Sequence, residues 1–307
     1  MLSRRVFQRG AAAALCALPF ARASAAEAEA VLGIVPSGDF LPAIVAQRKG
    51  YFAAQGFPAR IETISIISNI PAGLTSGSIQ LGVTTGPTFV QAVVNGLDLV
   101  AVSGNSRFSP DVATATLVSR PDLAIPTAAD LAGKRIAVPG LNSLLDLLLR
   151  RWLIARGVDP AQTQLVEAAF TQMGDMLRAG RVDLAIMKEP FAGRAVSTGA
   201  AKPYADYIKE VDPNGLNVFW IALGSWGRAN REACAKFRAA LEQGFDFVRK
   251  DPEARTIEQE VLHSRTDVLP RFDTRLTADD LRFELELSRQ FGLIDATPVD
   301  VSRLLVT

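Results

Sequence analysis

The sequence predicts an α/β protein of two lobes, each a mainly parallel sheet flanked by helices. Short apolar, β-branched runs alternate with helical stretches along most of the chain, which is the pattern of strand–helix–strand units. The alternation runs once from about residue 31 to 103 and restarts at about residue 135. With 307 residues, 49% of them apolar, the chain is long enough to fill two cores.

Each element follows from its local pattern. In the first unit, strands are expected at 31–35, 60–66, 79–84 and 97–103, with helices at 40–52, at 70–75 and after Pro87. The second unit has expected strands at 135–138, 164–168 and 182–187, and helices at 144–155 and 172–179. A last buried strand at 217–223 precedes three helices, at about 228–250, 252–262 and 277–291.

The second unit is expected to be inserted in the first. Residues 26–107 and 217–307 would form lobe 1, and residues 108–216 would form lobe 2. The chain would then cross between the lobes twice, near residues 104–110 and 213–217. Two crossings make a hinge, so the cleft between the lobes is the expected ligand site.

Residues 1–25 have the features of a cleavable export signal. Ser3-Arg4-Arg5-Val6-Phe7 resembles the twin-arginine signal of bacteria, and an alanine-rich apolar run leads to Ala23-Ser24-Ala25. The run is too short for a membrane helix, which needs about 20 apolar residues. We therefore expect cleavage near Ala25 and a periplasmic protein.

Composition excludes several function classes. Removal of the leader takes away four arginines and no acids, so the formal charge falls from +1 to −3 and gives no electrostatic reason to bind nucleic acid. The sole histidine, His263, and the one cysteine beyond the leader, Cys234, argue against metal clusters and histidine-dependent triads. We expect no metal, no cofactor, no catalysis and a monomer.

Three loops after strands carry hydroxyl and amide side chains. They begin at Ser37, at Thr84 and at Gly140, and each precedes a predicted helix. Ligands of open α/β sheets bind at such strand ends, where helix N-termini offer free N–H groups and partial positive charge. Ser143 and Asp146 have capping-box spacing. The alternative for each loop is that its side chains only cap a helix.

Three further residues are candidates for the cleft. Glu189 ends a strand and could accept from a ligand or bridge the lobes, whereas Trp220 could stack on a ligand or pack in the hinge. Lys188 is a possible pocket cation, although most lysines are solvated.

Four segments resemble the solute-binding proteins of bacterial ABC importers in the nitrate/sulfonate/taurine group, related to the fungal thiamine-pyrimidine synthases. Segment 46–52 is similar to the family's A-x-x-x-G-[FY]-F helix end, and 72–82 to a small-residue helix followed by G-x-[IV]-D-x-G, with Gln80 in place of the acid. Segment 129–139 is close to D-L-x-G-K-[RK]-[IV]-[AG]-[VT], and 180–190 resembles G-x-[IV]-D-A running into E-P-[FY].

The resemblance implies a type II periplasmic-binding-protein clamshell that closes on a ligand and docks on a permease driven by a cytoplasmic ATPase. It implies a pocket drawn from five loops. Together with Trp220, the candidate ligand-binding residues are Ser37, Asp39, Phe40, Ser68, Asn69, Thr84, Thr85, Gly86, Asn142, Ser143 and Glu189. Asp39 is a departure from what an anion site would need, because an acid in the first loop would repel an anion unless it points away or caps the helix.

The leading function is capture of a small anion, such as a sulfonate, nitrate or carboxylate, for import. One alternative is a thiamine-precursor pyrimidine or another heteroaromatic stacked on Phe40 or Trp220. Two others are an enzyme like the pyrimidine synthases and a sensory binding module. The predicted export and the position of the sole histidine disfavour the enzyme.

Overall fold

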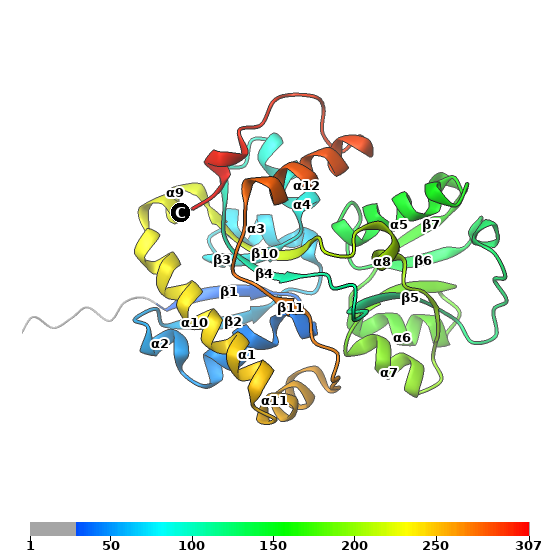
Figure 1. The fold of residues 1–307 in the computed structure, drawn as a ribbon, viewed down its shortest axis with the longest axis horizontal. Helices are drawn as coiled ribbons and strands as arrows, with labels where there is room; N and C mark the ends of the chain where they lie inside the picture. Colours follow the sequence, from blue (N-terminus) through cyan, green and yellow to red (C-terminus); the bar gives the residue numbers. More distant parts are fainter. Residues whose placement is uncertain (1–28, 307) are drawn as a thin grey trace, which may run out of the picture.

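The computed structural model describes residues 29–306, so the predicted leader and its cleavage site lie outside the described residues. Within them, two sheets with flanking helices stand side by side (Figure 1). We refer to the parts built on these sheets as lobe 1 and lobe 2. No helix in residues 29–306 combines the length and the apolar character that a membrane span requires.

Lobe 1 is built on a six-stranded sheet of order β11-β4-β10-β3-β1-β2. Its strands are β1 (Ala30–Ile34), β2 (Ala59–Thr63), β3 (Leu81–Thr84), β4 (Leu99–Arg107), β10 (Leu216–Leu223) and β11 (Arg271–Phe272). β1 pairs in parallel with β2 and β3, whereas β10 lies antiparallel between β3 and β4. The helices are α1 (Leu41–Arg48), α2 (Tyr51–Ala54), α3 (Ile70–Thr75), α4 (Gly86–Val94), α9 (Gly224–Ala229), α10 (Arg231–Lys250), α11 (Glu253–Leu262) and α12 (Ala278–Gln290), and the 3-10 turns are η1 (Gly38–Phe40), η2 (Ile67–Asn69) and η5 (Val301–Leu304).

Lobe 2 is built on a five-stranded sheet of order β7-β6-β8-β5-β9. Its strands are β5 (Ala115–Ser119), β6 (Arg135–Val138), β7 (Gln164–Glu167), β8 (Leu184–Lys188) and β9 (Lys202–Ala205). β6 pairs in parallel with β7 and β8, and β5 is antiparallel to β8 and β9. The helices are α5 (Leu144–Ala155), α6 (Phe170–Arg178), α7 (Phe191–Ser197) and α8 (Tyr207–Val211), and the 3-10 turns are η3 (Ala128–Leu131) and η4 (Pro160–Gln162).

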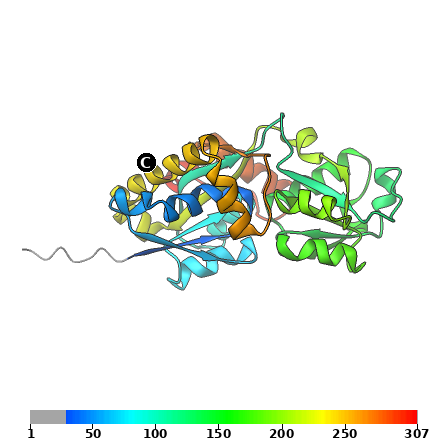
Figure 2. The ribbon, with the colours of Figure 1, turned by 90° about the horizontal axis from the view of Figure 1, so that it is seen from below.

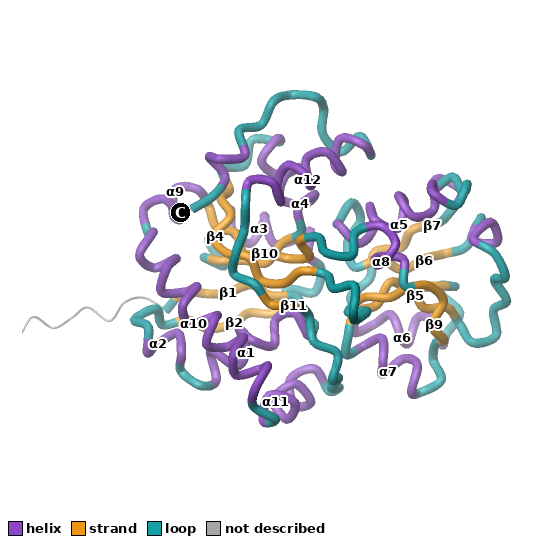
Figure 3. Tube along the Cα trace, viewed as in Figure 1, coloured by secondary structure: helices purple, strands orange, loops and turns teal. Residues whose placement is uncertain are grey.

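Two neighbouring strands carry the chain between the lobes. β4 leads out of lobe 1 and β10 returns to it, and the two pair antiparallel along most of their length (Figure 3). Just beyond them, the Phe108 N–H donates to the Gly215 carbonyl at 2.9 Å. Both crossings therefore lie side by side, and Figure 2 shows the lobes as separate bodies joined at this point. The division at 107/108 and 216/217 stays a prediction.

Long apolar faces hold each lobe together. On α5, Leu144, Leu147 and Leu148 are fully buried, because leucines three and four residues apart lie on one helix face. In lobe 1, Phe52 of α2 stacks on Phe237 of α10 with ring centroids 5.8 Å apart. Such packing makes each lobe a rigid support for the loops at its strand ends.

Most expected elements are present, and two expected helices are divided. The helix expected at 40–52 breaks at Gly50, whose φ of +72° lies in the left-handed region. The helix expected at 228–250 is interrupted at Asn230: residues 231–250 form α10, and residues 228–229 belong to the short preceding helix α9 (Gly224–Ala229). Strands β5, β9 and β11 and helices α7 and α8 are not predicted by the sequence patterns.

Candidate functional site

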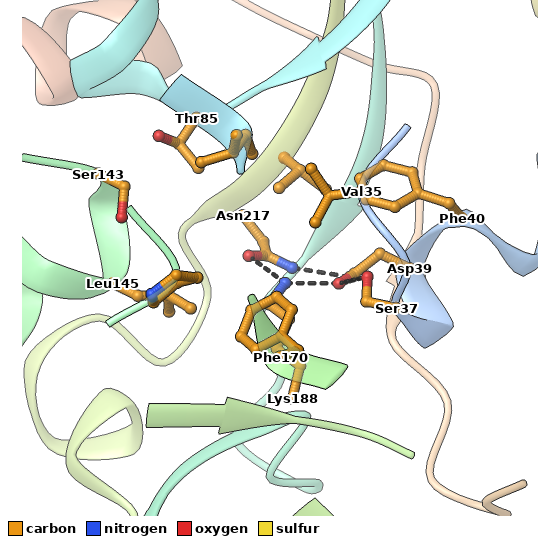
Figure 4. A pocket seen from close by; sticks show the side chains of 13 residues that line it. Val35, Ser37, Asp39, Phe40, Thr85, Ser143, Leu145, Phe170, Lys188 and Asn217 are labelled. Carbon is orange, nitrogen blue, oxygen red and sulfur yellow. Dashed lines mark hydrogen bonds and ion pairs between the residues drawn. The ribbon is translucent and has the colours of Figure 1, made fainter. Parts of the chain in front are cut away.

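A small cavity lies where the two lobes meet, at the carboxyl ends of β1, β3, β6 and β8. Its volume is about 30 Å³ with the lobes in contact, so a solute of more than a few atoms fits only when the lobes lie farther apart. It is lined by Val35, Ser37, Asp39, Phe40, Ile67, Thr85, Pro139, Ser143, Leu145, Phe170, Lys188, Asn217 and Val218. Both lobes and the returning strand β10 contribute side chains (Figure 4), and ligands of open α/β sheets bind beyond the carboxyl ends of the strands in this way.

A buried ion pair joins the lobes at this cavity. Lys188, the last residue of β8 in lobe 2, places Nζ 2.5 Å from Oδ2 of Asp39 in η1 of lobe 1. Only 4% of Lys188 and 2% of Asp39 are exposed. Burial lowers the pKa of the Lys188 ammonium, and the neighbouring Asp39 carboxylate opposes that effect. The pair holds each charge in a place where neither would be stable alone.

Three further side chains donate to the Asp39 carboxylate. Ser106 Oγ donates to Oδ1 at 2.7 Å, Asn217 Nδ2 donates to Oδ1 at 2.8 Å, and Ser37 Oγ donates to Oδ2 at 3.1 Å. The Oδ1 atom of Asn217 accepts from Lys188 Nζ at 2.8 Å. Together with Lys188, these donors from β4, β10 and its own loop saturate the carboxylate. Figure 4 shows Asp39 with Ser37, Lys188 and Asn217.

Two helix N-termini face each other across the opposite side of the cavity. Thr85 precedes α4 in lobe 1, and Ser143 precedes α5 in lobe 2. The Leu144 N–H, the first of α5, donates to Thr85 Oγ1 at 3.3 Å and links the lobes. Two helix N-termini bring partial positive charge to the same place.

The Ser143 hydroxyl is buried without a hydrogen-bond partner. The residue is 1% exposed, and its Oγ has no partner among the described residues. The capping box expected with Asp146 does not form, because Asp146 accepts from the Asn142 N–H at 2.7 Å and forms an ion pair with Arg150. A buried hydroxyl without a partner is costly, and this one lies in the cavity wall, where a solute atom could complete its bonding.

Further hydrogen bonds across the cleft surround the cavity. The Gly38 N–H donates to the Glu189 carbonyl at 3.0 Å, Ser68 Oγ donates to Glu167 Oε2 at 3.2 Å, and Ser264 Oγ donates to the Pro190 carbonyl at 3.2 Å. The lobes thus contact each other on several sides of the cavity. A solute larger than a few atoms can enter only when they separate.

Five of the twelve predicted site residues line the cavity, namely Ser37, Asp39, Phe40, Thr85 and Ser143. The other seven, Ser68, Asn69, Thr84, Gly86, Asn142, Glu189 and Trp220, lie outside its lining. The predicted loops thus reach the cavity, whereas most of the predicted side chains do not line it, and the role of these residues in ligand binding stays a prediction.

Trp220 packs beneath the cavity instead of facing it. It is fully buried, its Nε1 donates to Asn105 Oδ1 at 2.9 Å, and its ring meets Phe40 edge-on with centroids 6.2 Å apart. The indole is thus enclosed by core groups, and Phe40 is the aromatic side chain of this pair that reaches the cavity.

The Glu189 side chain points to another surface. Its carboxylate accepts from the Gly193 N–H of the following helix α7 at 3.3 Å, and it borders a separate hollow with Tyr204 in lobe 2. The bridge expected between the lobes at this residue is made by its backbone carbonyl and not by its carboxylate.

Gly86 is explained by packing. A Cβ atom placed on it would lie 2.1 Å from Cγ of Glu284, a fully buried residue of α12. Burial raises the pKa of the Glu284 carboxyl well above its usual range. The absence of a side chain at Gly86 therefore makes room for α12 and not for a ligand.

Of the remaining four residues, Thr84 and Asn142 serve local structure, Ser68 joins the lobes and Asn69 is exposed. Thr84 donates to the Thr85 carbonyl at 3.2 Å, and Asn142 takes a φ of +61°, in the left-handed region that asparagine tolerates. Ser68 lies at the rim, bonded to Glu167, and Asn69 is exposed at the end of η2.

Sequence reasoning missed Asn217 and named Lys188 only as a possible pocket cation. Asn217 opens a strand that is otherwise apolar, and Lys188 ends a strand that is buried throughout. A polar residue at the end of a buried run was the available signal in both cases. No group of three or more metal-ligating side chains occurs within residues 29–306.

Comparison with known families decides the classification. The family model described as "NMT1/THI5 like" matches residues 37–255, well over half of the chain. The chain belongs to the NMT1/THI5-like family. Its matched segment includes η1, both crossing strands and every predicted site residue, and of the thirteen residues that line the cavity only Val35 lies outside it.

Curated relatives of this NMT1/THI5-like protein differ in the fraction of the chain that they match. The nitrate/nitrite binding protein NrtA of Nostoc sp. is 26% identical over 209 residues, which cover 59% of this chain and 46% of that protein. The chain thus spans less than half the length of this relative. The riboflavin-binding protein RibY of Chloroflexus aurantiacus is 25% identical over 314 residues, which cover 93% of this chain and 86% of that protein.

Solved structures share the fold of this NMT1/THI5-like protein. The alkanesulfonate-binding protein SsuA from Xanthomonas axonopodis pv. citri, solved with MOPS bound, matches with a TM-score of 0.76 and 19% identity, over 92% of this chain and 99% of that one. The periplasmic nitrate-binding protein NrtA from Synechocystis PCC 6803 matches with a TM-score of 0.77 and 14% identity, over 90% and 86%. The two-lobed α/β fold predicted from the sequence is confirmed.

Proposed function

We propose that this NMT1/THI5-like protein is the periplasmic substrate-binding component of an ABC importer, which captures a small solute between its lobes. The observation that carries the proposal is the inter-lobe cavity, in which a buried Ser143 hydroxyl without a partner lies between two facing helix N-termini. A solute that bonds to both lobes would stabilise their contact, as the clamshell mechanism requires.

The relatives supply the transport context. Among them are a nitrate/nitrite binding protein and a nitrate import ATP-binding protein. We infer that the closed form docks as a monomer on a membrane permease whose ATPase lies in the cytoplasm. The predicted leader would place the protein in the periplasm.

A binding role fits the cavity better than catalysis. Its one acid and its one base, Asp39 and Lys188, are bonded to each other. A general acid or base must instead reach the substrate's proton. A sensory role would use the same cavity, and neighbouring permease and ATPase genes would favour import.

Two solute classes fit this function. An anion such as a sulfonate, nitrate or carboxylate suits the helix N-termini and the Ser143 hydroxyl. A heteroaromatic solute suits the apolar lining, in which Phe40 and Phe170 take part, and agrees with the near full-length match to a riboflavin-binding protein.

A binding screen tests the proposed site. Thermal shift and calorimetric titration of the purified protein would cover alkyl and aryl sulfonates, nitrate, aromatic carboxylates, hydroxymethylpyrimidine and riboflavin. For a solute that binds, Ser143→Ala combined with Thr85→Ala should weaken affinity about tenfold or more, because each lost hydrogen bond costs about 1 kcal/mol. Ser76→Ala, at an exposed site in lobe 1, is the control. Equal affinity in all three proteins would place the site elsewhere.

A further inference from the structure

The charge balance of the cavity bears on which solutes it accepts. Among its thirteen lining residues, Asp39 and Lys188 alone have ionised side chains. They lie 2.5 Å apart and come from opposite lobes. The lining as a whole therefore carries no net charge when the lobes are together.

Lys188 is not available as a counter-ion. Its ammonium already donates to Asp39 and to Asn217 Oδ1. An anion placed beside Lys188 would gain attraction from the ammonium and suffer repulsion from a carboxylate at nearly the same distance. Because an ammonium has three N–H bonds, one donor remains for an acceptor atom of the solute.

Asp39 cannot turn away from Lys188 without losing several hydrogen bonds. Its carboxylate accepts from Ser106, Asn217 and Ser37, and its backbone carbonyl accepts from Asn105 Nδ2 at 2.9 Å. These partners lie in lobe 1 and on the returning strand, so Asp39 stays in the cavity wall when the lobes separate. The negative charge of Asp39 is therefore a fixed feature of the cavity wall.

The rest of the lining favours an uncharged body. Seven of its residues are apolar: Val35, Phe40, Ile67, Pro139, Leu145, Phe170 and Val218. In such surroundings an ion without a counter-charge is strongly disfavoured, whereas a neutral group with a hydrogen bond is tolerated. The Ser143 hydroxyl and the helix N-termini can supply that bond to a carbonyl oxygen or a ring nitrogen.

We infer that the Asp39–Lys188 pair makes the cavity selective for solutes without net charge, such as aromatic amides or nitrogen heteroaromatics, over simple anions. This inference rests on the proposed function. It departs from the anion that the sequence favours, and it makes Asp39 a specificity-determining residue.

The test compares isosteric probes by titration calorimetry. Benzamide and benzoate share one shape and differ in charge, and nitrate provides an anion without an apolar body. The wild-type protein should bind benzamide at least tenfold more tightly than benzoate and show no binding of nitrate at millimolar concentration. In Asp39→Asn the freed Lys188 should shift the ratio at least tenfold toward benzoate. Asp39→Asn with Lys188→Met should lose that gain.

The outcomes separate the two proposals. Wild-type protein that binds benzoate or nitrate as tightly as benzamide would overturn the charge selectivity and leave the solute site standing. An unchanged ratio in a folded Asp39→Asn, with circular dichroism as the check, would do the same. If Asp39→Asn does not fold, the wild-type ratio decides. Absence of binding by every probe in every variant would overturn the solute site itself, and the charge selectivity with it.

Discussion

Asn217 Nδ2 lies 2.8 Å from Oδ1 of Asp39. The first residue belongs to β10, the strand that returns from lobe 2, and the second belongs to the loop after β1 in lobe 1. The same amide accepts from Lys188 of lobe 2. The hinge strand, lobe 1 and lobe 2 thus meet in a single hydrogen-bonded group at the cavity, so changes in this group should affect stability as well as binding.

Replacement of Asn217 by alanine should destabilise the protein by about 2 kcal/mol or more, since buried partners would lose hydrogen bonds to charged groups. Urea unfolding followed by circular dichroism measures the change. Asn69→Ala, at an exposed asparagine, should stay within about 0.5 kcal/mol of the wild type. A similar small effect at Asn217 would show that water replaces its side chain.

Lys188 and Asp39 should be strongly coupled. Lys188→Met and Asp39→Asn should each cost about 3–5 kcal/mol, because each leaves an uncompensated charge in a buried place. The double variant should cost less than the two changes together by more than about 1 kcal/mol. A double-mutant cycle of unfolding free energies measures this coupling, and strictly additive values would contradict the ion pair.

Gly86→Ala should destabilise the protein by about 1–3 kcal/mol, because the new Cβ would overlap Glu284. Glu284→Ala removes the obstructing side chain, so the double variant should be more stable than Gly86→Ala alone. Gly174→Ala is a matched control, since a Cβ there meets only Ala195 at 3.9 Å on a helix. It should raise stability slightly. Melting temperatures of the wild type and of each variant measure these changes in stability. A Gly86→Ala protein as stable as the wild type would refute the packing account.

Asp212 should make stability depend on pH. Burial raises the pKa of its carboxyl to about 6, opposed by Arg151, by a hydrogen bond at Gly215 and by Arg107, and assisted by Asp280. An acid whose pKa is raised on folding stabilises the protein below its unfolded pKa of 3.8, and that contribution is lost as pH rises through about 6. The contribution of Asp212 to the free energy of unfolding of the wild type should therefore fall by about 1–3 kcal/mol between pH 4 and 7.

Asp212→Asn should flatten that decline, because asparagine does not titrate and can accept the same hydrogen bond. Denaturant titrations at pH 4, 5, 6 and 7 give the comparison. Asp111→Asn, at an exposed position, should keep the wild-type profile. The same decline in both variants would assign the pH dependence to other groups.

Local sequence patterns were sufficient to predict the α/β class. Apolar residues recur with different periods in strands and in helices, and both lobes repeat the alternation of the two. The boundaries of α3, α5 and β6 agree with the sequence expectation, since glycines and prolines stand at or near their ends. β5 and β9 were missed because both are short and carry polar residues or a proline, so neither shows a continuous apolar run. Strand order and hinge pairing are long-range properties that no local pattern carries.

The site was predicted at the level of loops, for the same reason. Ser37, Thr85 and Ser143 stand at strand ends, which sequence position alone makes visible. The partners of Asp39 are Ser106, Lys188 and Asn217, which come from three distant strands. Their meeting depends on how the lobes close, so the resemblance to a family could flag Asp39 as unusual without showing what neutralises it.

The hydrogen bond from Phe108 to Gly215 closes the base of lobe 2 at a single point. In the predicted division, residues 108–216 form one cassette whose ends adjoin each other, the arrangement in which domain insertion is best tolerated. Exchange of this cassette between relatives would replace Pro139, Ser143, Leu145, Phe170 and Lys188 in one step and leave the lobe 1 wall intact. New specificities can thus arise by recombination at one junction, as well as by point mutation.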